Sequence, residues 1–185
     1  MKNIFLIHGS FGHPEENWFP WLKEKCEKLG YRVFAPQFPA GKNQSMESWR
    51  KTFEPYEKFF TEQTIVVGHS LGPAFLLDVI EKLHTPLRAA FFVSSFINLL
   101  GNPTFDDVNR SFVDRTFNWE RIQNNCKKYV LFHSDNDPYV PLVEAENIAR
   151  KLDVNVHVIR NGGHLNTEAG YTTFPELLDE IQKVL

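Results

Sequence analysis

The stretch TIVVGHSLGPAFLLDVI, residues 64–80, places Ser70 between two glycines, where one apolar run ends and another begins. The first run, residues 64–68, is short and rich in β-branched side chains, which is typical of a strand buried on both faces. The second run, residues 71–83, is apolar nearly all round, which predicts a helix at the centre of the molecule. The stretch therefore predicts a buried strand, a tight turn that contains Ser70, and a buried helix.

Short apolar runs alternate with helical patterns along the whole chain. This alternation predicts an α/β fold with a doubly wound, mostly parallel six-stranded sheet and helices on both faces. The expected strands are residues 3–8, 31–35, 64–68, 89–94, 129–133 and 155–159. The expected helices are residues 20–30, 49–60, 71–83, 142–152 and 175–185. Pro55 argues against an unbroken second helix, because proline removes a helical hydrogen bond.

The chain has 185 residues, of which 42% are hydrophobic and 23% charged, and this composition predicts a single domain over residues 1–185. One segment, residues 96–119, does not fit the alternation of strands and helices. Long connections inside compact domains are usually functional or disordered, and the aromatic content of this one argues against disorder. We therefore expect residues 96–119 to form a cap or insertion over the edge of the sheet.

Charge and composition argue against several classes of protein. The net charge is −3, and no run of Lys or Arg exceeds two residues, so a nucleic-acid or anionic-membrane partner is not expected. The N-terminal apolar run, residues 4–7, is too short for a secretion signal, and we expect a cytoplasmic protein. Cys26 and Cys126 form no CxxC pair, so two buried free thiols are expected. No metal-ligand spacing and no nucleotide-binding motif occurs, so neither a metal nor a cofactor is expected.

Residues 68–72, Gly-His-Ser-Leu-Gly, form the pattern G-x-S-x-G between a predicted strand and a predicted helix. This context is the one that a nucleophile elbow requires, with Ser70 held above the sheet. The turn is so tight that side chains at the two flanking positions would collide with neighbours, which explains the glycines. Chance also produces this pattern, and a glycine-rich turn with an incidental serine is the alternative interpretation.

A serine nucleophile needs a base, and the base needs an orienting acid. Both are expected in loops at the carboxyl ends of later strands, in the order serine, acid, histidine. His164 follows the last predicted strand, and Asp137 or Asp135 follows the strand before it. We favour Asp137 as the acid, because the Pro-Tyr-Val-Pro segment after it stiffens its loop, and we expect Asp135 to bond the amides of its own turn. Helix capping and an ordinary surface loop are the alternatives for these residues.

An oxyanion hole requires two amide donors. One is expected to be the N–H of Leu71, directly after the nucleophile. The other is expected from the loop after the first strand, where residues 8–12 read H-G-x-x-G, and either Ser10 or Phe11 is its donor. Phe11, His69 and Phe96 are the candidate residues for contact with the substrate.

The motifs GHSLG at 68–72, DNDPYVP at 135–141 and GGHLN at 162–166 make the chain resemble the α/β-hydrolase superfamily. More narrowly, it resembles the small serine hydrolases grouped with retinoblastoma-binding protein 9 and bacterial YdeN-like proteins. The resemblance extends over essentially the whole chain. It implies a trimmed α/β hydrolase with a triad of Ser70, Asp137 and His164, and esterase or amidase-like activity on small esters or aminoacyl compounds.

The same resemblance does not bring a protein partner with it. Neither Cys26 nor Cys126 lies in an L-x-C-x-E motif, so a retinoblastoma-protein partnership is not expected. The sequence therefore predicts a serine hydrolase of the esterase type that acts through an acyl-enzyme. Two alternatives stay open: a thioesterase or peptidase with the same catalytic residues, and an inactive hydrolase fold that serves as a binding or regulatory module.

Overall fold

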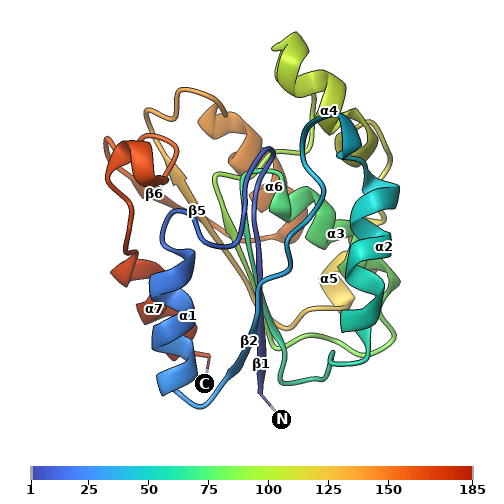
Figure 1. The fold of residues 1–185 in the computed structure, drawn as a ribbon, viewed down its shortest axis with the longest axis vertical. Helices are drawn as coiled ribbons and strands as arrows, with labels where there is room; N and C mark the ends of the chain where they lie inside the picture. Colours follow the sequence, from blue (N-terminus) through green and yellow to red (C-terminus); the bar gives the residue numbers. More distant parts are fainter. Residues whose placement is uncertain (1, 185) are drawn as a thin grey trace.

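Six parallel strands form one sheet at the centre of the computed structural model, which describes residues 2–184 (Figure 1). Their order across the sheet is β2-β1-β3-β4-β5-β6, and every neighbouring pair is parallel. The strands are β1 (Asn3–Ile7), β2 (Arg32–Phe34), β3 (Ile65–His69), β4 (Ala89–Val93), β5 (Tyr129–Ser134) and β6 (Val156–Ile159). Each bound lies within one residue of the sequence-based prediction, so the six-stranded doubly wound sheet is confirmed.

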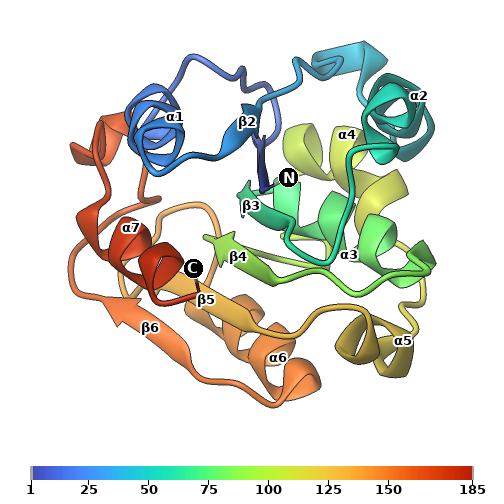
Figure 2. The same cartoon turned by 90° about the horizontal axis from the view of Figure 1, so that it is seen from below.

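Helices cover both faces of this sheet (Figure 2). Two helices, α1 (Phe19–Lys28) and α7 (Pro175–Gln182), pack on one face, where their buried side chains join one hydrophobic cluster. The opposite face carries α2 (Met46–Glu57), α3 (Gly72–Lys82), α4 (Pro103–Val113), α5 (Trp119–Asn124) and α6 (Leu142–Leu152). Two short 3₁₀ helices, η1 (Gly41–Asn43) and η2 (Thr167–Ala169), lie in loops. Leu185, the last residue of the predicted final helix, lies outside the described residues.

Helix α2 departs from the prediction, because it continues through Pro55 to Glu57 without a break. The proline lies in the last turn, so it removes only one hydrogen bond close to the point where the helix ends. Trp49 and Phe53 are buried on the same face and fix the helix against the core. Tertiary packing thus outweighs the local cost of the proline.

Helix α3 occupies the centre of the molecule, as its apolar sequence predicts. All residues from Gly72 to Ile80 are buried, and the helix packs on β3 and contacts α4 and α5. Because α3 follows β3 directly, the turn between them is held from both sides by buried elements. This rigidity fixes the position of Ser70, which lies in that turn.

The segment at residues 96–119 contains helix α4 and leads into α5. Asn102 begins α4 by accepting a hydrogen bond from the N–H of Thr104 at 3.1 Å, and Phe112 is fully buried. The helix projects beyond the carboxyl ends of the strands (Figure 1). The segment is thus ordered, as its aromatic content predicts, and its first half lies at the edge of the sheet where the candidate site residues gather.

Two further expectations can be compared with the structure. Cys26 and Cys126 are both buried free cysteines, as predicted. Among residues 2–184, no helix is long and apolar enough to cross a membrane.

Candidate active site

Ser70 lies in a strained turn between β3 and α3. Its φ is 58°, in the left-handed region that residues other than glycine adopt only when the surrounding structure enforces it. A Cβ at Gly68 would lie 2.7 Å from the backbone nitrogen of Pro73, and a Cβ at Gly72 would collide with the backbone oxygen of Ile7. Both flanking positions therefore require glycine, as the elbow motif predicts.

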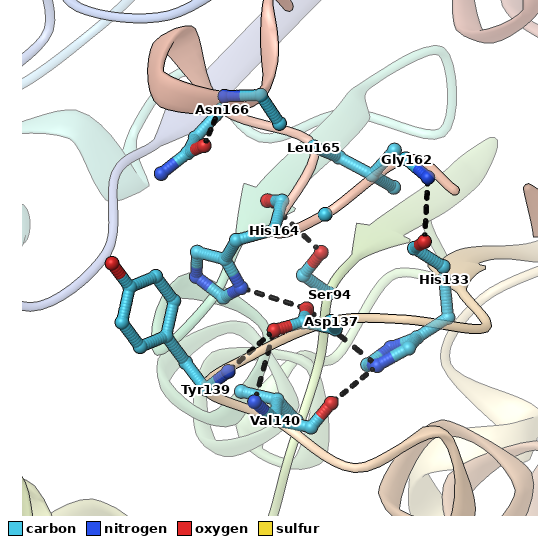
Figure 3. Close-up of polar contacts among 12 residues, drawn as sticks. Ser94, His133, Asp137, Tyr139, Val140, Gly162, His164, Leu165 and Asn166 are labelled. Atoms are coloured by element: carbon cyan, nitrogen blue, oxygen red, sulfur yellow. Dashed lines mark hydrogen bonds and ion pairs between the residues drawn. The ribbon is translucent and has the colours of Figure 1, made fainter.

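The structure brings Asp137 and His164 into contact. The loop after β5 carries Asp137 and the loop after β6 carries His164, and the distance from Asp137 Oδ2 to His164 Nδ1 is 2.8 Å (Figure 3). The other carboxylate oxygen, Oδ1, accepts hydrogen bonds from the N–H groups of Tyr139 and Val140, at 2.9 and 3.0 Å. Asp137 is the acid that meets the histidine, in agreement with the preferred assignment.

No lysine or arginine within residues 2–184 forms an ion pair with Asp137. Burial alone would raise the pKa of this carboxyl, but the hydrogen bonds from His164 and from two backbone amides lower the pKa below its usual value. Because an ionised carboxylate only accepts hydrogen bonds, His164 Nδ1 must carry the hydrogen. When the ring is neutral, its Nε2 is left as a proton acceptor.

Ser70 and His164 line one cavity of about 410 Å³ at the carboxyl ends of the strands. Within the described chain, the Ser70 hydroxyl forms no hydrogen bond, so the serine–histidine contact is not made in this structure. Catalytic hydrogen bonds of this kind often tighten only when substrate is bound. A larger hollow, of about 570 Å³ between α2 and α3, includes none of the strand-end loops and none of the candidate residues.

Three consecutive side chains, from the last residue of β5 and the two that follow it, fix the histidine loop. Ser134 Oγ accepts from the N–H of Gly162, Asp135 Oδ1 from that of Asn161, and Asn136 Oδ1 from that of Gly163, each at 2.8 Å. The prediction that Asp135 bonds the amides of its own turn is wrong, because its carboxylate reaches the neighbouring loop. The sequence signal that points to these three hydrogen bonds is the polar run Ser-Asp-Asn that follows the apolar residues of β5.

The backbone carbonyl of His164 is held by two more side chains. It accepts from His69 Nε2 at 2.9 Å. It also accepts from Ser94 Oγ at 3.2 Å (Figure 3). Burial lowers the pKa of His69 to about 3, so its ring is neutral and donates from Nε2. We expected His69 to contact the substrate, but the residue is only 3% exposed and its hydrogen bond goes to the histidine loop.

His133 is a further residue of the site that the sequence did not reveal. Its Nε2 lies 2.9 Å from the carbonyl oxygen of Val140 and 3.7 Å from Asp137 Oδ2. Burial lowers its pKa, which keeps the ring neutral beneath the carboxylate. Both His133 and Ser94 belong to or directly follow apolar strands, where a single polar residue gives no pattern that sequence reasoning can recognise.

The expected oxyanion donors both lie beside Ser70. A Cβ at Gly9 would lie 2.7 Å from Ser70 Cβ, so the loop after β1 runs against the serine. In that loop the N–H of Phe11 donates to Gln44 Oε1 at 3.4 Å, whereas the N–H of Ser10 has no partner in the described residues. The N–H of Leu71, directly before α3, also has no hydrogen-bond partner in the described residues. Ser10 is therefore better placed than Phe11 as the second donor.

Aromatic side chains form much of the cavity wall. Phe11 is 47% exposed and lies at the mouth of the cavity. The buried Phe96 forms part of the cavity wall, as do the half-buried Phe105 and Leu100. Glu168 lies at the rim, where it accepts a hydrogen bond from the Tyr139 hydroxyl at 2.9 Å. An adjoining hollow of about 290 Å³ adds the carboxylate of Glu16. Neither hollow contains a lysine or an arginine, and no cluster suited to a metal ion occurs in residues 2–184.

The family is decided by a match that spans nearly the whole chain. A family model described as "Serine hydrolase" matches residues 4–183. The chain belongs to the serine hydrolase family. This serine hydrolase is 28% identical over 180 residues to the hydrolase YdeN of Bacillus subtilis, a match that covers 96% of this chain and 93% of YdeN. It is 26% identical over 169 residues to the serine hydrolase RBBP9 of Rattus norvegicus, covering 91% and 86% of the two chains.

Solved structures agree with this assignment. The crystal structure of the ydeN gene product of B. subtilis superposes on the serine hydrolase with a TM-score of 0.92 and 27% identity, and covers 100% of this chain and 98% of that one. A YdeN-like hydrolase from Pectobacterium atrosepticum gives a TM-score of 0.73 with 16% identity, which shows the shared fold alone. The resemblance to the α/β-hydrolase superfamily and its small YdeN-like members is thereby confirmed.

Proposed function

We propose that this serine hydrolase cleaves small carboxylic esters or aminoacyl compounds through an acyl-enzyme, with Ser70 as nucleophile, His164 as general base and Asp137 as the orienting acid. The observation that carries the proposal is the 2.8 Å contact between His164 and the buried Asp137, since His164 lines the same cavity as Ser70 on its strained elbow. Family membership supports hydrolysis. The assignment of the three residues is our own inference from their geometry.

The reaction proceeds by two acyl transfers. His164 Nε2 takes the proton from the Ser70 hydroxyl as its oxygen attacks the substrate carbonyl, and the same nitrogen gives that proton to the departing alcohol or amine. Water then enters and loses a proton to His164 as its oxygen attacks the acyl carbonyl. His164 returns this proton to Ser70 Oγ as the bond to the acyl group breaks, which releases the acid and restores the free enzyme. Asp137 holds Nδ1–H throughout and stabilises the positive charge of the imidazolium, because no lysine or arginine among residues 2–184 pairs with this carboxylate.

The carbonyl oxygen becomes negatively charged in each tetrahedral intermediate. We propose that the N–H groups of Leu71 and Ser10 donate to this oxyanion, since both lie beside Ser70 and have no other partner among the described residues. Loss of one such donor typically slows turnover by roughly 10²–10³-fold. The start of α3 adds the partial positive charge of its free amides at the same point.

The cavity supports small substrates with an apolar part. Its volume of about 410 Å³ and its aromatic wall suit a short acyl chain or an aromatic group, and residues 96–119 act as the cap that shapes it. Glu16 and Glu168 support the aminoacyl alternative, because two carboxylates without a nearby lysine or arginine favour a protonated amine. Ester, thioester and amide substrates all fit the same chemistry.

The setting we propose is the cytoplasm. The buried thiols of Cys26 and Cys126 support this placement, because free cysteines persist in reducing compartments. No protein partner is proposed.

A catalytically weak binding module is the second candidate, favoured because the Ser70 hydroxyl has no hydrogen bond among residues 2–184. Hydrolysis of p-nitrophenyl acetate and butyrate distinguishes the two. The Ser70→Ala variant is expected to lose roughly 10⁶-fold in kcat if the triad works. Ser111→Ala, a serine outside the cavity, serves as the matched control and is expected to retain the parental rate. Activity of Ser70→Ala within tenfold of the parent would refute the assignment of the nucleophile.

A further inference from the structure

A chain of hydrogen bonds joins the loop after β1 to helix α4. The N–H of Phe11 donates to Gln44 Oε1, which turns the amino group of Gln44 the other way, toward Asn109. This amino group donates to Asn109 Oδ1 at 2.9 Å, and the Ser10 hydroxyl donates to the same oxygen at 2.5 Å. The direction of the whole chain is thus set by a backbone amide, which can only donate.

The orientation of the Asn109 carboxamide follows from this chain. An amino group in the place of Oδ1 would face the amino group of Gln44, donor against donor. Nδ2 is therefore the atom on the opposite side, and it has no hydrogen-bond partner among residues 2–184. Nδ2 is not fully buried either, because it does not belong to the side-chain atoms of the described residues that lack both solvent contact and a hydrogen-bond partner.

Asn109 lines the same cavity as Ser70 and His164, although the residue as a whole is only 2% exposed. A polar group that is buried without a partner lowers stability, so an amino group directed into a cavity is a binding element for whatever enters. Its neighbour Ser10 carries the amide that we assign to the oxyanion. We therefore assign the side of the cavity that carries Ser10 and Asn109 to the acyl part of a substrate attached at Ser70.

We propose that Asn109 is a specificity-determining residue whose Nδ2 donates a hydrogen bond to an oxygen atom in the acyl chain of the substrate. The preferred acyl groups accordingly carry an ether, hydroxyl or carbonyl oxygen a short distance beyond the reacting carbonyl. This inference rests on the proposed function, because it assumes that the acyl group is held at Ser70. It adds a substrate preference that the triad alone does not imply.

Matched esters test this preference by kinetics. The first pair is p-nitrophenyl methoxyacetate and p-nitrophenyl butyrate, and the second is p-nitrophenyl 3-methoxypropanoate and p-nitrophenyl valerate; within a pair, one CH₂ is replaced by oxygen. Asn109→Asp keeps an oxygen for Ser10 and Gln44 and replaces only the amino group. The ratio of kcat/KM for ether over alkyl ester is expected to fall by about tenfold in this variant for at least one pair, because a donor is lost.

Asn102→Asp is the matched control for the added charge. Asn102 lines the same cavity, and its side chain caps α4 through an oxygen that aspartate also provides. This variant places the same negative charge in the cavity and is expected to leave the ether-to-alkyl ratio at the parental value. An equal fall of the ratio in both variants, or an unchanged ratio in Asn109→Asp for both pairs, overturns the proposal.

A binding measurement keeps the two proposals separable and leaves Asn109 intact. In ¹⁵N-labelled Ser70→Ala protein, the Asn109 side-chain NH₂ signals are identified by their loss on adding Asn109→Asp. They are expected to shift with an ether ester and to stay in place with its alkyl partner. If they shift while the parental enzyme turns over no ester, the proposed function fails, and only the contact between Asn109 and the ether oxygen stands. If neither ether ester moves them, this inference fails whatever the activity.

Discussion

Two aspartates, Asp137 and Asp78, have side chains that are almost completely buried, yet their charges are offset in different ways. Asp78, on α3, is bound by Arg50, Lys82 and Arg115, which tie α2 and the segment after α4 to the central helix. Asp137 has no lysine or arginine partner in the described chain and is bound by backbone amides and a histidine.

The difference separates a carboxylate that stabilises the fold from one available for chemistry. Around Asp78 the positive charges are permanent, so its negative charge is already fully offset. Around Asp137 the ion-pair partners among the described residues are two histidine rings, and one of them, His164, lines the cavity with Ser70. In the mechanism proposed above, the carboxylate of Asp137 stabilises a positive charge on His164 that exists only during the reaction. The identity of the partners therefore says more about function than burial does.

The largest effect is expected from Asp137→Asn. Asparagine keeps the shape but removes the charge and allows the wrong imidazole tautomer, so kcat is expected to fall by roughly 10⁴-fold. Steady-state hydrolysis of p-nitrophenyl acetate measures the change, and thermal unfolding checks that the fold survives. A fall of less than tenfold would contradict the role assigned to Asp137.

Asp78→Asn is expected to give the opposite result, with kcat kept near the parental value and stability reduced. The loss is expected to be about 2–3 kcal/mol, because three hydrogen-bonded cations lose their common partner but can still reach water. Urea unfolding measures it, with Asp107→Asn as a control on the exposed side of α4. If Asp78→Asn lowers kcat as strongly as Asp137→Asn, the two carboxylates do not differ as described.

Asn136→Ala tests whether the hydrogen bonds from residues 134–136 position the histidine loop. The variant loses the hydrogen bond to the N–H of Gly163, and His164 is then less firmly placed. We expect kcat to fall about tenfold with little change in KM, since a misplaced base weakens the transition state more than binding. Asn124→Ala, at the exposed end of α5, is the control. Equal kcat and KM in the two variants would show that the hydrogen bond between Asn136 and Gly163 does not position His164.

The smallest effect is a dependence of stability on pH. Burial lowers the pKa of His69 from 6.5 to about 3 in the folded protein. As the pH falls below about 6.5, this histidine is therefore protonated in the unfolded chain before it is protonated in the folded one. Stability due to this group is present at neutral pH and declines between about pH 6.5 and pH 3. His69→Gln keeps a donor for His164 O and removes the titration.

From about pH 7 to about pH 5.5, the parental protein is therefore expected to lose about 1 kcal/mol more unfolding free energy than His69→Gln. Asp78→Asn is expected to show the parental pH dependence, because that carboxylate lies away from the buried histidines. Urea unfolding at the two pH values measures both. Parallel losses in the parent and in His69→Gln would contradict the neutral, buried state of this ring.

The sequence predicted the sheet well, because strands buried on both faces read as continuous apolar runs. It also predicted Ser70, Asp137 and His164 as a group, since polar residues at the carboxyl ends of parallel strands meet at one edge. It did not predict the bonds of Asp135 to the next loop. Nor did it predict the contact between Gln44 and Asn109, which are 65 residues apart and meet only in the folded chain. Such contacts depend on tertiary packing and leave no local pattern.

The central claim is that Ser70 is the nucleophile, and a covalent probe tests it most directly. Incubation with a fluorophosphonate followed by intact-mass and peptide analysis is expected to give one adduct per chain, on the peptide that contains Ser70. Asp137→Asn is expected to label much more slowly at the same residue, and Ser70→Ala to remain unmodified. An unlabelled parental protein, or an adduct that persists in Ser70→Ala, would contradict the account.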